Sequence, residues 1–180
     1  MGFVVKQLHF FLFIKGKDKI KSGMSNIPYQ IRKLSQKQDL PFDLLMLADE
    51  TIEAIEKYIY ESDVYVAVEN EQSRPIAVFV LYKSGDKEIE IKNIAVAECR
   101  QNAGIGSLLV SEIKRIALAA KCENLIVGTP GSATRQINFY EKNGFKKYDV
   151  RKDFFVQNYP TPIIENGIIL TDMLMLKMEL

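Results

Sequence analysis

The sequence predicts a mixed α/β fold, in which helices flank a twisted central mixed sheet. Alternating or continuous β-rich runs occupy 64–69 and 76–82, and a third run extends over 88–97. A long amphipathic pattern typical of a helix then follows a glycine-containing turn and leads to a short apolar strand at 124–129. The expected order is therefore strands, then strand, helix, strand and helix, and finally further strands.

The segment before the first long strand predicts additional elements. "YQIRKL" at Tyr29–Leu34 alternates and indicates a short strand. From Leu44 to Tyr60 the apolar residues recur at roughly helical spacing, which fits one or two helices with Asp49 and Glu50 near a second start. The polar stretch "NEQSRP" that follows 64–69 indicates a hairpin connection.

The strand at 88–97 has an irregular pattern. Ile89 and Ile91 lie on one face of an alternating strand, but Ile94 and Val96 would then fall on the opposite face. One extra residue near 92–93 would restore the register as a β-bulge, bend the strand away from its neighbour and open a slot in the sheet. A harmless kink, or a strand buried on both faces, fits the same pattern.

The helix after the turn has a clear apolar face, and the later elements follow from local signals. Its expected buried residues are Ile105, Leu108, Leu109, Ile113, Ile116, Ala117 and Ala120. A second helix is expected near 133–143, where Gly144 can adopt the left-handed position after the helix end. Phe145 starts another strand, and the remainder gives two strands separated by a proline-rich loop.

Composition excludes several classes of protein. The 24 Lys and Arg residues nearly balance the 23 Asp and Glu residues, and 47% of the chain is apolar, which is typical of a soluble globular domain without a nucleic-acid partner. Cys99 and Cys122 have no metal-binding or disulfide-scaffold spacing, and His9 is the single histidine, so we expect no metal. The expected location is the reducing cytoplasm.

Residues 1–23 are treated separately from an expected single domain at 24–180. The run "FVVKQLHFFLFI" contains Lys6 and His9 and is too short to cross a bilayer, so no membrane partner is expected. The charged stretch "IKGKDKIKSG" follows it, which is the wrong order for a secretory signal. Met24 begins a plausible domain, and residues 1–23 are then an extension, an extra strand or an artefact of the assigned translation start.

The turn before the long helix predicts an anion site. Gly104 and Gly106 allow the main chain to approach a ligand closely, and about five N–H groups between Gln101 and Ser107 could point at one anion at the helix N-terminus. A loop that needs glycine only for its shape is the alternative. The P-loop spacing GxxxxGK[ST] is absent, and "GIGSLL" lacks the third glycine of the dinucleotide fingerprint.

Two short motifs, at Gln101–Gly106 and Phe139–Phe145, resemble signatures of the GNAT family of N-acetyltransferases. "QNAGIG" at Gln101–Gly106 is similar to the family signature Q/R-x-x-G-x-G/A, and "FYEKNGF" at Phe139–Phe145 resembles its tyrosine-containing helix with the following Gly-Phe. The resemblance is best from Glu88 to Tyr148 and extends in outline from Met24 to the end. It implies the GNAT fold, acetyl-CoA as the donor and transfer of an acetyl group to a primary amine.

The resemblance also implies roles for individual residues. The main chain of the bent strand would pair with the pantetheine arm, the turn amides would hold the pyrophosphate, and Ser107 would add a hydroxyl. The implied CoA-binding residues are Ile94, Ala95, Val96, Gln101, Asn102, Ala103, Gly104, Ile105, Gly106 and Ser107. A main-chain N–H near Val96 or Ile94 would stabilise the oxyanion.

Tyr140 matches the family's general acid, which protonates the departing thiolate; a core tyrosine is the alternative. Where the family often has Asn and Ala, seven and four residues before this tyrosine, the chain has Ala133 and Gln136.

The acceptor amine must lose a proton before it attacks, because an ammonium with a pKa of about 10.4 is not a nucleophile. Glu90 lies eleven residues before Gln101, an offset similar to that of the glutamate base in histone-modifying members of the family. Glu88 shares its face, and neighbouring carboxylates raise one another's pKa. Water, a main-chain carbonyl or a merely solvated strand face are the alternatives.

The acceptor itself stays open among an amino acid, a polyamine, an antibiotic amine and a protein N-terminus or lysine. Residues 44–60 and the loop "VQNYPTPIIENG" are expected to select it, the latter through Tyr159, Pro160, Pro162, Glu165 and Asn166, although such residues also simply make turns. Neither cysteine lies in a nucleophile motif, so a ternary complex is expected. The alternatives are a non-catalytic acyl-CoA sensor or partner-binding module, and an enzyme for a longer acyl-CoA. The resemblance is compatible with a homodimer.

Overall fold

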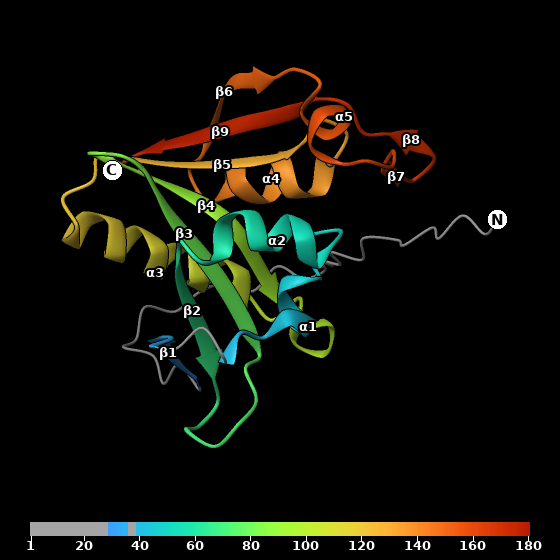
Figure 1. Cartoon of the computed structure of the whole chain (residues 1–180). Helices are drawn as coiled ribbons and strands as arrows, with labels where there is room; N and C mark the ends of the chain where they lie inside the picture. Colours follow the sequence, from blue (N-terminus) through green and yellow to red (C-terminus); the bar gives the residue numbers. More distant parts are fainter. Residues whose placement is uncertain (1–28, 36–38) are drawn as a thin grey trace.

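A computed structural model describes residues 29–35 and 39–180, so the expectations for residues 1–23 lie outside the described residues. Its main feature is a sheet of seven strands, and the prediction of a mixed α/β fold is confirmed (Figure 1). In spatial order the strands are β1 (Gln30–Lys33), β2 (Asp63–Val68), β3 (Ala77–Gly85), β4 (Glu88–Val96), β5 (Asn124–Pro130), β9 (Met173–Glu179) and β6 (Lys146–Arg151). The β4–β5 pair is parallel, and the other neighbours are antiparallel.

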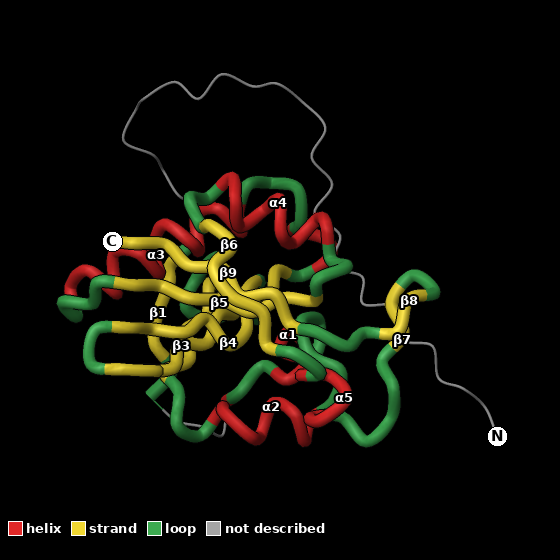
Figure 2. Tube along the Cα trace, turned by 90° about the horizontal axis from the view of Figure 1, so that it is seen from above, coloured by secondary structure: helices red, strands yellow, loops and turns green. Residues whose placement is uncertain are grey.

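Helices cover both faces of this sheet. They are α1 (Phe42–Leu45), α2 (Ile52–Ile59), α3 (Ile105–Ala119), α4 (Thr134–Lys142) and α5 (Phe154–Asn158), with a short 3₁₀ turn at Glu98–Arg100. Figure 2 shows α3 and α4 on one side of the strands and α2 and α5 on the other. Within the described residues, no helix has the length and apolar character needed to cross a membrane.

The two faces carry separate apolar cores. Leu109 and Ile113 of α3 are fully buried against the face that also receives Phe139 and Tyr140 of α4. On the opposite face, α1 and α2 bury their apolar side chains against β2 and β3. α3 thus forms as its pattern predicts, except that Leu108 and Ala120 are exposed while Val110 is buried.

The predicted bulge in β4 is confirmed. Val80 of β3 pairs with Asn93, but the next residue, Leu81, pairs with Ile91, so Lys92 is the inserted residue. The insertion restores the register across the strand, because Ile91 and Ile94 then contribute to the same core beneath α3. The alternating pattern on either side of Lys92 therefore required this bulge.

Beyond the bulge, β4 leaves its parallel neighbour. Only Glu88–Ile91 pair with Asn124–Val127, and the remaining residues of the two strands have no register with each other. Figure 1 shows β4 and β5 starting side by side and then separating. The predicted slot in the sheet therefore lies between the second halves of these strands.

The segment between β6 and β9 contains more structure than the expected proline-rich loop. It forms α5 and then a small hairpin of β7 (Ile164–Glu165) and β8 (Ile168–Ile169). The hairpin projects from the edge of the molecule in both overall views. Local sequence did not predict α5, because Asp153 at its start adopts the left-handed conformation and provides no side-chain cap. Gly144 takes the expected left-handed position after α4, with a φ of 97°.

Candidate active site

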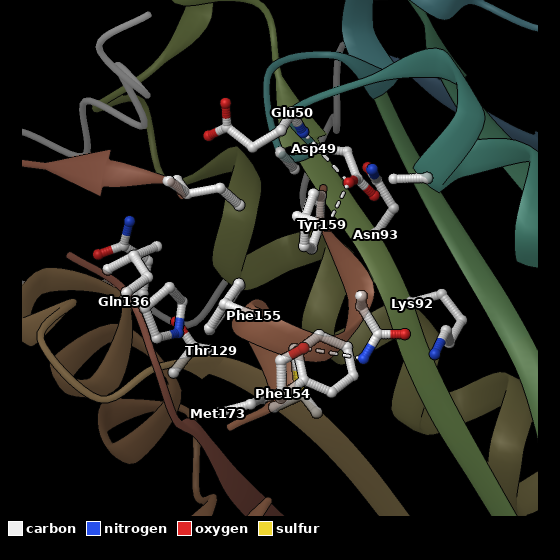
Figure 3. A pocket seen from close by; sticks show the side chains of 18 of the residues that line it. Asp49, Glu50, Lys92, Asn93, Thr129, Gln136, Phe154, Phe155, Tyr159 and Met173 are labelled. Carbon is white, nitrogen blue, oxygen red and sulfur yellow. Dashed lines mark hydrogen bonds between the residues drawn. The ribbon is translucent and has the colours of Figure 1, made fainter. Parts of the chain in front are cut away.

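A cavity of about 310 Å³ lies where β4 and β5 separate. Its wall includes the bulge residues Lys92 and Asn93, the second half of β5, and side chains from α4. The segment before α2 and the segment around α5 close the other side (Figure 3). The cavity thus joins the gap in the sheet to a pocket between helices on the α2 face.

The first part, which we call the β4 slot, is bounded by Ile94, Val127, Gly128 and Tyr140. Its β4 edge presents main-chain groups. The amide of Ala97 donates to the carbonyl of Ile76, just before β3, at 2.8 Å. Because main-chain groups alternate in direction along an antiparallel strand, the N–H and C=O of the preceding Val96 point away from β3.

The same alternation turns the main chain of Ile94 toward the slot, whereas Ala95 faces β3 and buries its side chain against α1 and α2. The carbonyl of Val96 accepts from the Gln101 side chain at 2.9 Å, which supports this orientation. Both main-chain groups of Ile94 and the N–H of Val96 therefore face the gap without a partner strand among the described residues, whereas the Val96 carbonyl already accepts from Gln101.

The turn after β4 presents a row of amides. No described residue accepts a hydrogen bond from the N–H groups of residues 102–107. Asn102 and Gly104 have positive φ angles of 67° and 78°, which direct the chain into α3. Asn102, Ala103, Gly104 and Ser107 are exposed, whereas Ile105 and Gly106 are buried.

Gln101 differs from the rest of this turn. Its amide already donates to Glu98 at 3.2 Å, so the open row starts at Asn102. Its side chain instead bridges the turn to the end of β4 through Val96. Gln101 thus positions the turn beside the slot, and the N-terminus of α3 supplies partial positive charge to the open amides.

Tyr140 lies on α4 at the wall of the slot. It is buried, and its ring makes edge contacts with Phe139 at 5.2 Å and Phe145 at 5.5 Å between centroids. Burial raises the pKa of its phenol, so the hydroxyl stays protonated at neutral pH. No described residue hydrogen-bonds to this hydroxyl, which leaves its proton available to a bound molecule.

Glu90 lies on β4 before the bulge but does not line the cavity. Its carboxylate is buried, 3.2 Å from the ammonium of Lys92 and 3.4 Å from the guanidinium of Arg151. Glu88 accepts from Ser84 at 3.0 Å on the rim of the sheet. The two glutamates therefore have different direct partners, and a catalytic role of Glu90 stays a prediction.

The second part of the cavity, which we call the Asp49 pocket, is formed by Asp49, Tyr58, Asn93, Phe155 and Tyr159. The Asp49 carboxylate accepts from the hydroxyls of Tyr58 at 3.0 Å and Tyr159 at 3.1 Å and from the amide of Glu50 at 3.2 Å. In Figure 3 Asp49 and Tyr159 face one another. Burial raises the pKa of Asp49 despite these hydrogen bonds, which act in the opposite direction.

Asn93 connects this pocket to the bulge. Its amide nitrogen donates to the carbonyl of Leu45 at 3.0 Å and to the hydroxyl of Tyr58 at 3.2 Å. Its side-chain oxygen is buried and receives no hydrogen bond from any described residue. A buried amide oxygen without a donor is costly unless a bound molecule provides one.

Sequence reasoning located the segments of this pocket but missed its central residue. Tyr159 and Glu165 line the cavity as expected, whereas Pro160, Pro162 and Asn166 do not. The sequence places Asp49 only near the start of a helix, and the residue that caps this helix is Thr51. Nothing local marks Asp49 as functional, because its partners Tyr58 and Tyr159 are 9 and 110 residues away.

Other expectations concern α4 and metals. Gln136 lines the cavity beside Thr129, and Ala133 is buried just before α4. In the described part of the chain, no group of three or more His, Cys, Asp or Glu residues is arranged to hold a metal ion. Cys99 is exposed and Cys122 is buried, and neither lines the cavity.

Comparisons with known proteins agree with this geometry. A family model of the acetyltransferase (GNAT) domain matches residues 60–147. The uncharacterized N-acetyltransferase YvbK of Bacillus subtilis strain 168 is 34% identical over 139 residues, which cover 77% of this chain and 88% of that protein.

Solved structures show the same fold. A GNAT family acetyltransferase from Elizabethkingia anophelis with acetyl-CoA bound has 42% identity and a TM-score of 0.80, over 86% of this chain and 99% of that one. A Bacillus subtilis acetyltransferase in complex with CoA has 32% identity and a TM-score of 0.76, over 84% of this chain and 99% of that one. These relatives share sequence and fold with this chain, in whose sheet β4 and β5 separate. The chain therefore belongs to the GNAT family of N-acetyltransferases.

Proposed function

We propose that the protein transfers the acetyl group of acetyl-CoA to a primary amine by direct attack within a ternary complex. The observation that carries this proposal is one continuous cavity that joins the strand edge at Ile94 of β4 to a pocket lined by the Asp49 carboxylate, which has no salt bridge among the described residues. One end suits an extended amide-containing chain, and the other suits an amine. The relatives solved with acetyl-CoA and CoA support the choice of donor.

The donor would lie along the β4 slot. Its pantetheine arm contains amide groups that can pair with the main chain of Ile94 and Val96 as an added strand does. Its pyrophosphate would accept from the open amides of 102–107 at the positive end of α3. Because these are main-chain groups, the site needs the backbone conformation of Gly104 more than any particular side chain.

The chemistry requires two proton losses from the acceptor and one proton gain by the leaving group. The ammonium first loses a proton, and the amine lone pair then attacks the thioester carbonyl carbon. The oxyanion forms beside the main-chain N–H groups of Ile94 or Val96, which stabilise it. Collapse breaks the carbon–sulfur bond, and the nitrogen loses its second proton as the amide forms.

Tyr140 would donate the proton that the CoA thiolate takes up. Its pKa is raised, so it holds this proton in the resting enzyme and regains one from the acceptor nitrogen through solvent. The overall reaction then releases one proton from an ammonium substrate. Glu90 remains a candidate for the first deprotonation, acting through water, because its carboxylate contacts Lys92 and that lysine lines the cavity.

Initial-rate kinetics and product analysis test the proposal together. The full chain is incubated with acetyl-CoA labelled in its acetyl group and with representative amines of each acceptor class. We expect free CoA thiol and labelled amide in equal amounts. Double-reciprocal plots of the initial rate against amine concentration, measured at several acetyl-CoA concentrations, should intersect, as a ternary complex requires. Parallel plots together with a labelled enzyme would indicate a covalent intermediate and contradict direct attack. Acetyl-CoA binding without product from any amine would favour a sensor or binding module.

A further inference from the structure

The Asp49 carboxylate has no salt bridge in the described part of the chain, and the ammonium of Lys92 acts on it only at longer range because it is held by Glu90. The three hydrogen-bond donors to Asp49 are two phenols and one amide. By contrast, Glu90, the buried carboxylate near the bulge, has two cationic partners. A carboxylate removed from water in this way favours a ligand that brings a positive charge.

The cationic side chains that line the same cavity are already engaged. The ammonium of Lys57 donates to the carbonyl of Asn158 at 2.9 Å. The ammonium of Lys92 is held by Glu90 at 3.2 Å. Glu50 and Glu165 add further carboxyl groups to the lining. The lining therefore has three carboxylates, at Asp49, Glu50 and Glu165, against two ammonium groups, and this charge balance disfavours an acceptor that carries a carboxylate, such as an amino acid.

The remaining wall is apolar and comes from the C-terminal segment. Phe155 is buried and contacts Phe154 edge-on at 5.3 Å and Tyr159 in a stacked arrangement at 6.0 Å between centroids. Ile163, Leu170 and Met173 continue this wall. Such a surface binds an apolar or aromatic body, because burying that body removes both surfaces from water.

The size of the cavity limits how large the acceptor can be. Its volume of about 310 Å³ is shared between the β4 slot and the Asp49 pocket. This lies at the lower end of the usual range for small-molecule sites, about 300–1,000 Å³. A long polycation would need more room and more than one carboxylate along its length.

We infer that Asp49 binds the ammonium group of the acceptor, and that the acceptor is a small primary amine with one positive charge, an apolar or aromatic body and no carboxylate. This inference rests on the proposed function. Tyr58 and Tyr159 hold the carboxylate by its two oxygens, and Asn93 offers its side-chain oxygen as a second acceptor for the ammonium. The amine nitrogen would thus lie beside the bulge, where β4 departs from β5.

The experiment compares amines that differ in one group. Acetylation by the full chain is measured at saturating acetyl-CoA with 2-phenylethylamine, L-phenylalanine, which adds only a carboxylate, and the polycation spermidine. We expect kcat/KM for 2-phenylethylamine to be at least about 10-fold above that for either of the others, since a buried unpaired charge costs that much or more. A preference for L-phenylalanine or spermidine would overturn the inference.

Asp49→Asn tests the residue, with Asp86→Asn in the exposed turn between β3 and β4 as the matched control. Truncating a buried charge pair costs at least about 30-fold, so kcat/KM for 2-phenylethylamine should fall by that factor, mainly through KM. Equal activity of the two variants would overturn the assignment of Asp49.

Calorimetry with acetyl-CoA separates this inference from the proposed function. We expect wild type and Asp49→Asn to bind acetyl-CoA equally. If acetyl-CoA binds and some other class of amine is acetylated, the inference about the acceptor is wrong while the proposed function holds. If acetyl-CoA does not bind to the wild type at all, the proposed function fails and the inference fails with it.

Discussion

The β4 slot and the Asp49 pocket adjoin each other but are built from different parts of the chain. The slot and the turn beyond it present main-chain groups, at Ile94, Val96 and 102–107. The pocket presents side chains, chiefly Asp49 and Tyr159, that come from distant segments. A main-chain site survives most side-chain changes as long as the backbone keeps its course, whereas a side-chain site changes its ligand with each substitution. One scaffold can therefore keep a constant donor while its acceptor changes.

The largest effect is expected at Tyr140, the side chain on the wall of the β4 slot that we propose as the general acid. Tyr140→Phe should lower kcat by about 100-fold or more, the usual contribution of a general acid, and leave the affinity for acetyl-CoA unchanged. The phenyl ring keeps the edge contacts with Phe139 and Phe145, so the fold should be retained. Thiol release measured beside Tyr148→Phe, on exposed β6, checks this. A kcat within about 3-fold of wild type, far short of the contribution of about 100-fold or more from a general acid, would remove Tyr140 from the mechanism.

A smaller loss is expected where the donor site depends on backbone shape. Gly104→Ala should raise the dissociation constant of acetyl-CoA about 10-fold, because a left-handed conformation costs an alanine about 1–2 kcal/mol and the turn would relax away from it. Gly167→Ala is a matched control, since both glycines have a φ of 78° and open space around an added Cβ. Calorimetry should show weakened binding for Gly104→Ala alone, and equal weakening in both would refute the anion site.

The buried Glu90 and the half-buried Asp49 should respond in opposite ways when their carboxylates are replaced by amides. Glu90→Gln leaves Lys92 and Arg151 without their shared anion, so the free energy of unfolding should fall by about 1 kcal/mol. Asp49→Asn removes a charge that burial disfavours, so it should be at least as stable as wild type at neutral pH while losing activity.

The pH dependence of unfolding tests whether the charge on Asp49 destabilises the native state. Its native pKa lies above the unfolded value, so the native state binds this proton more tightly and loses stability as the pH rises through that interval. The advantage of Asp49→Asn in urea unfolding should therefore shrink as the pH falls from above the native pKa of Asp49 toward about 4, its unfolded value, and stay constant below that. Lys92, Tyr58 and Tyr159 face the same group and should be kept intact in this comparison. An advantage that grows toward acid pH would contradict the assignment.

The smallest effect is expected at the start of α2, which carries one wall of the pocket. The Thr51 hydroxyl accepts from the amide of Ala54 at 3.1 Å as the helix cap. Thr51→Ala should lower the free energy of unfolding by about 0.5–1 kcal/mol, whereas Thr51→Ser should retain it. Chemical denaturation measures both. Because Asp49 lies two residues earlier, only a few-fold loss of kcat/KM is expected, and identical stability of the two variants would contradict the cap.

The difference between the two regions also explains what the sequence could predict. The turn at 101–107 and the bulge at Lys92 were predictable because glycine placement and strand alternation are local signals of backbone geometry. The place of Asp49 in the pocket could not be predicted in this way, since its partners Tyr58 and Tyr159 come from separate elements and only the folded chain brings them together. α5 was missed for a related reason, because a buried Phe155 stabilises a turn that lacks its own cap.

The single inserted residue in β4 has a consequence for how this chain can vary in length. Strand side chains alternate between two sides, so adding or removing one residue between Glu90 and Ile94 would exchange the inward and outward sets of everything beyond it. Ile94 and Val96 would then turn their main chains toward β3 and away from the gap. We therefore expect this segment to tolerate insertions or deletions of two residues better than those of one. The extra residue Lys92 sets which side chains of the rest of the strand face each side of the sheet.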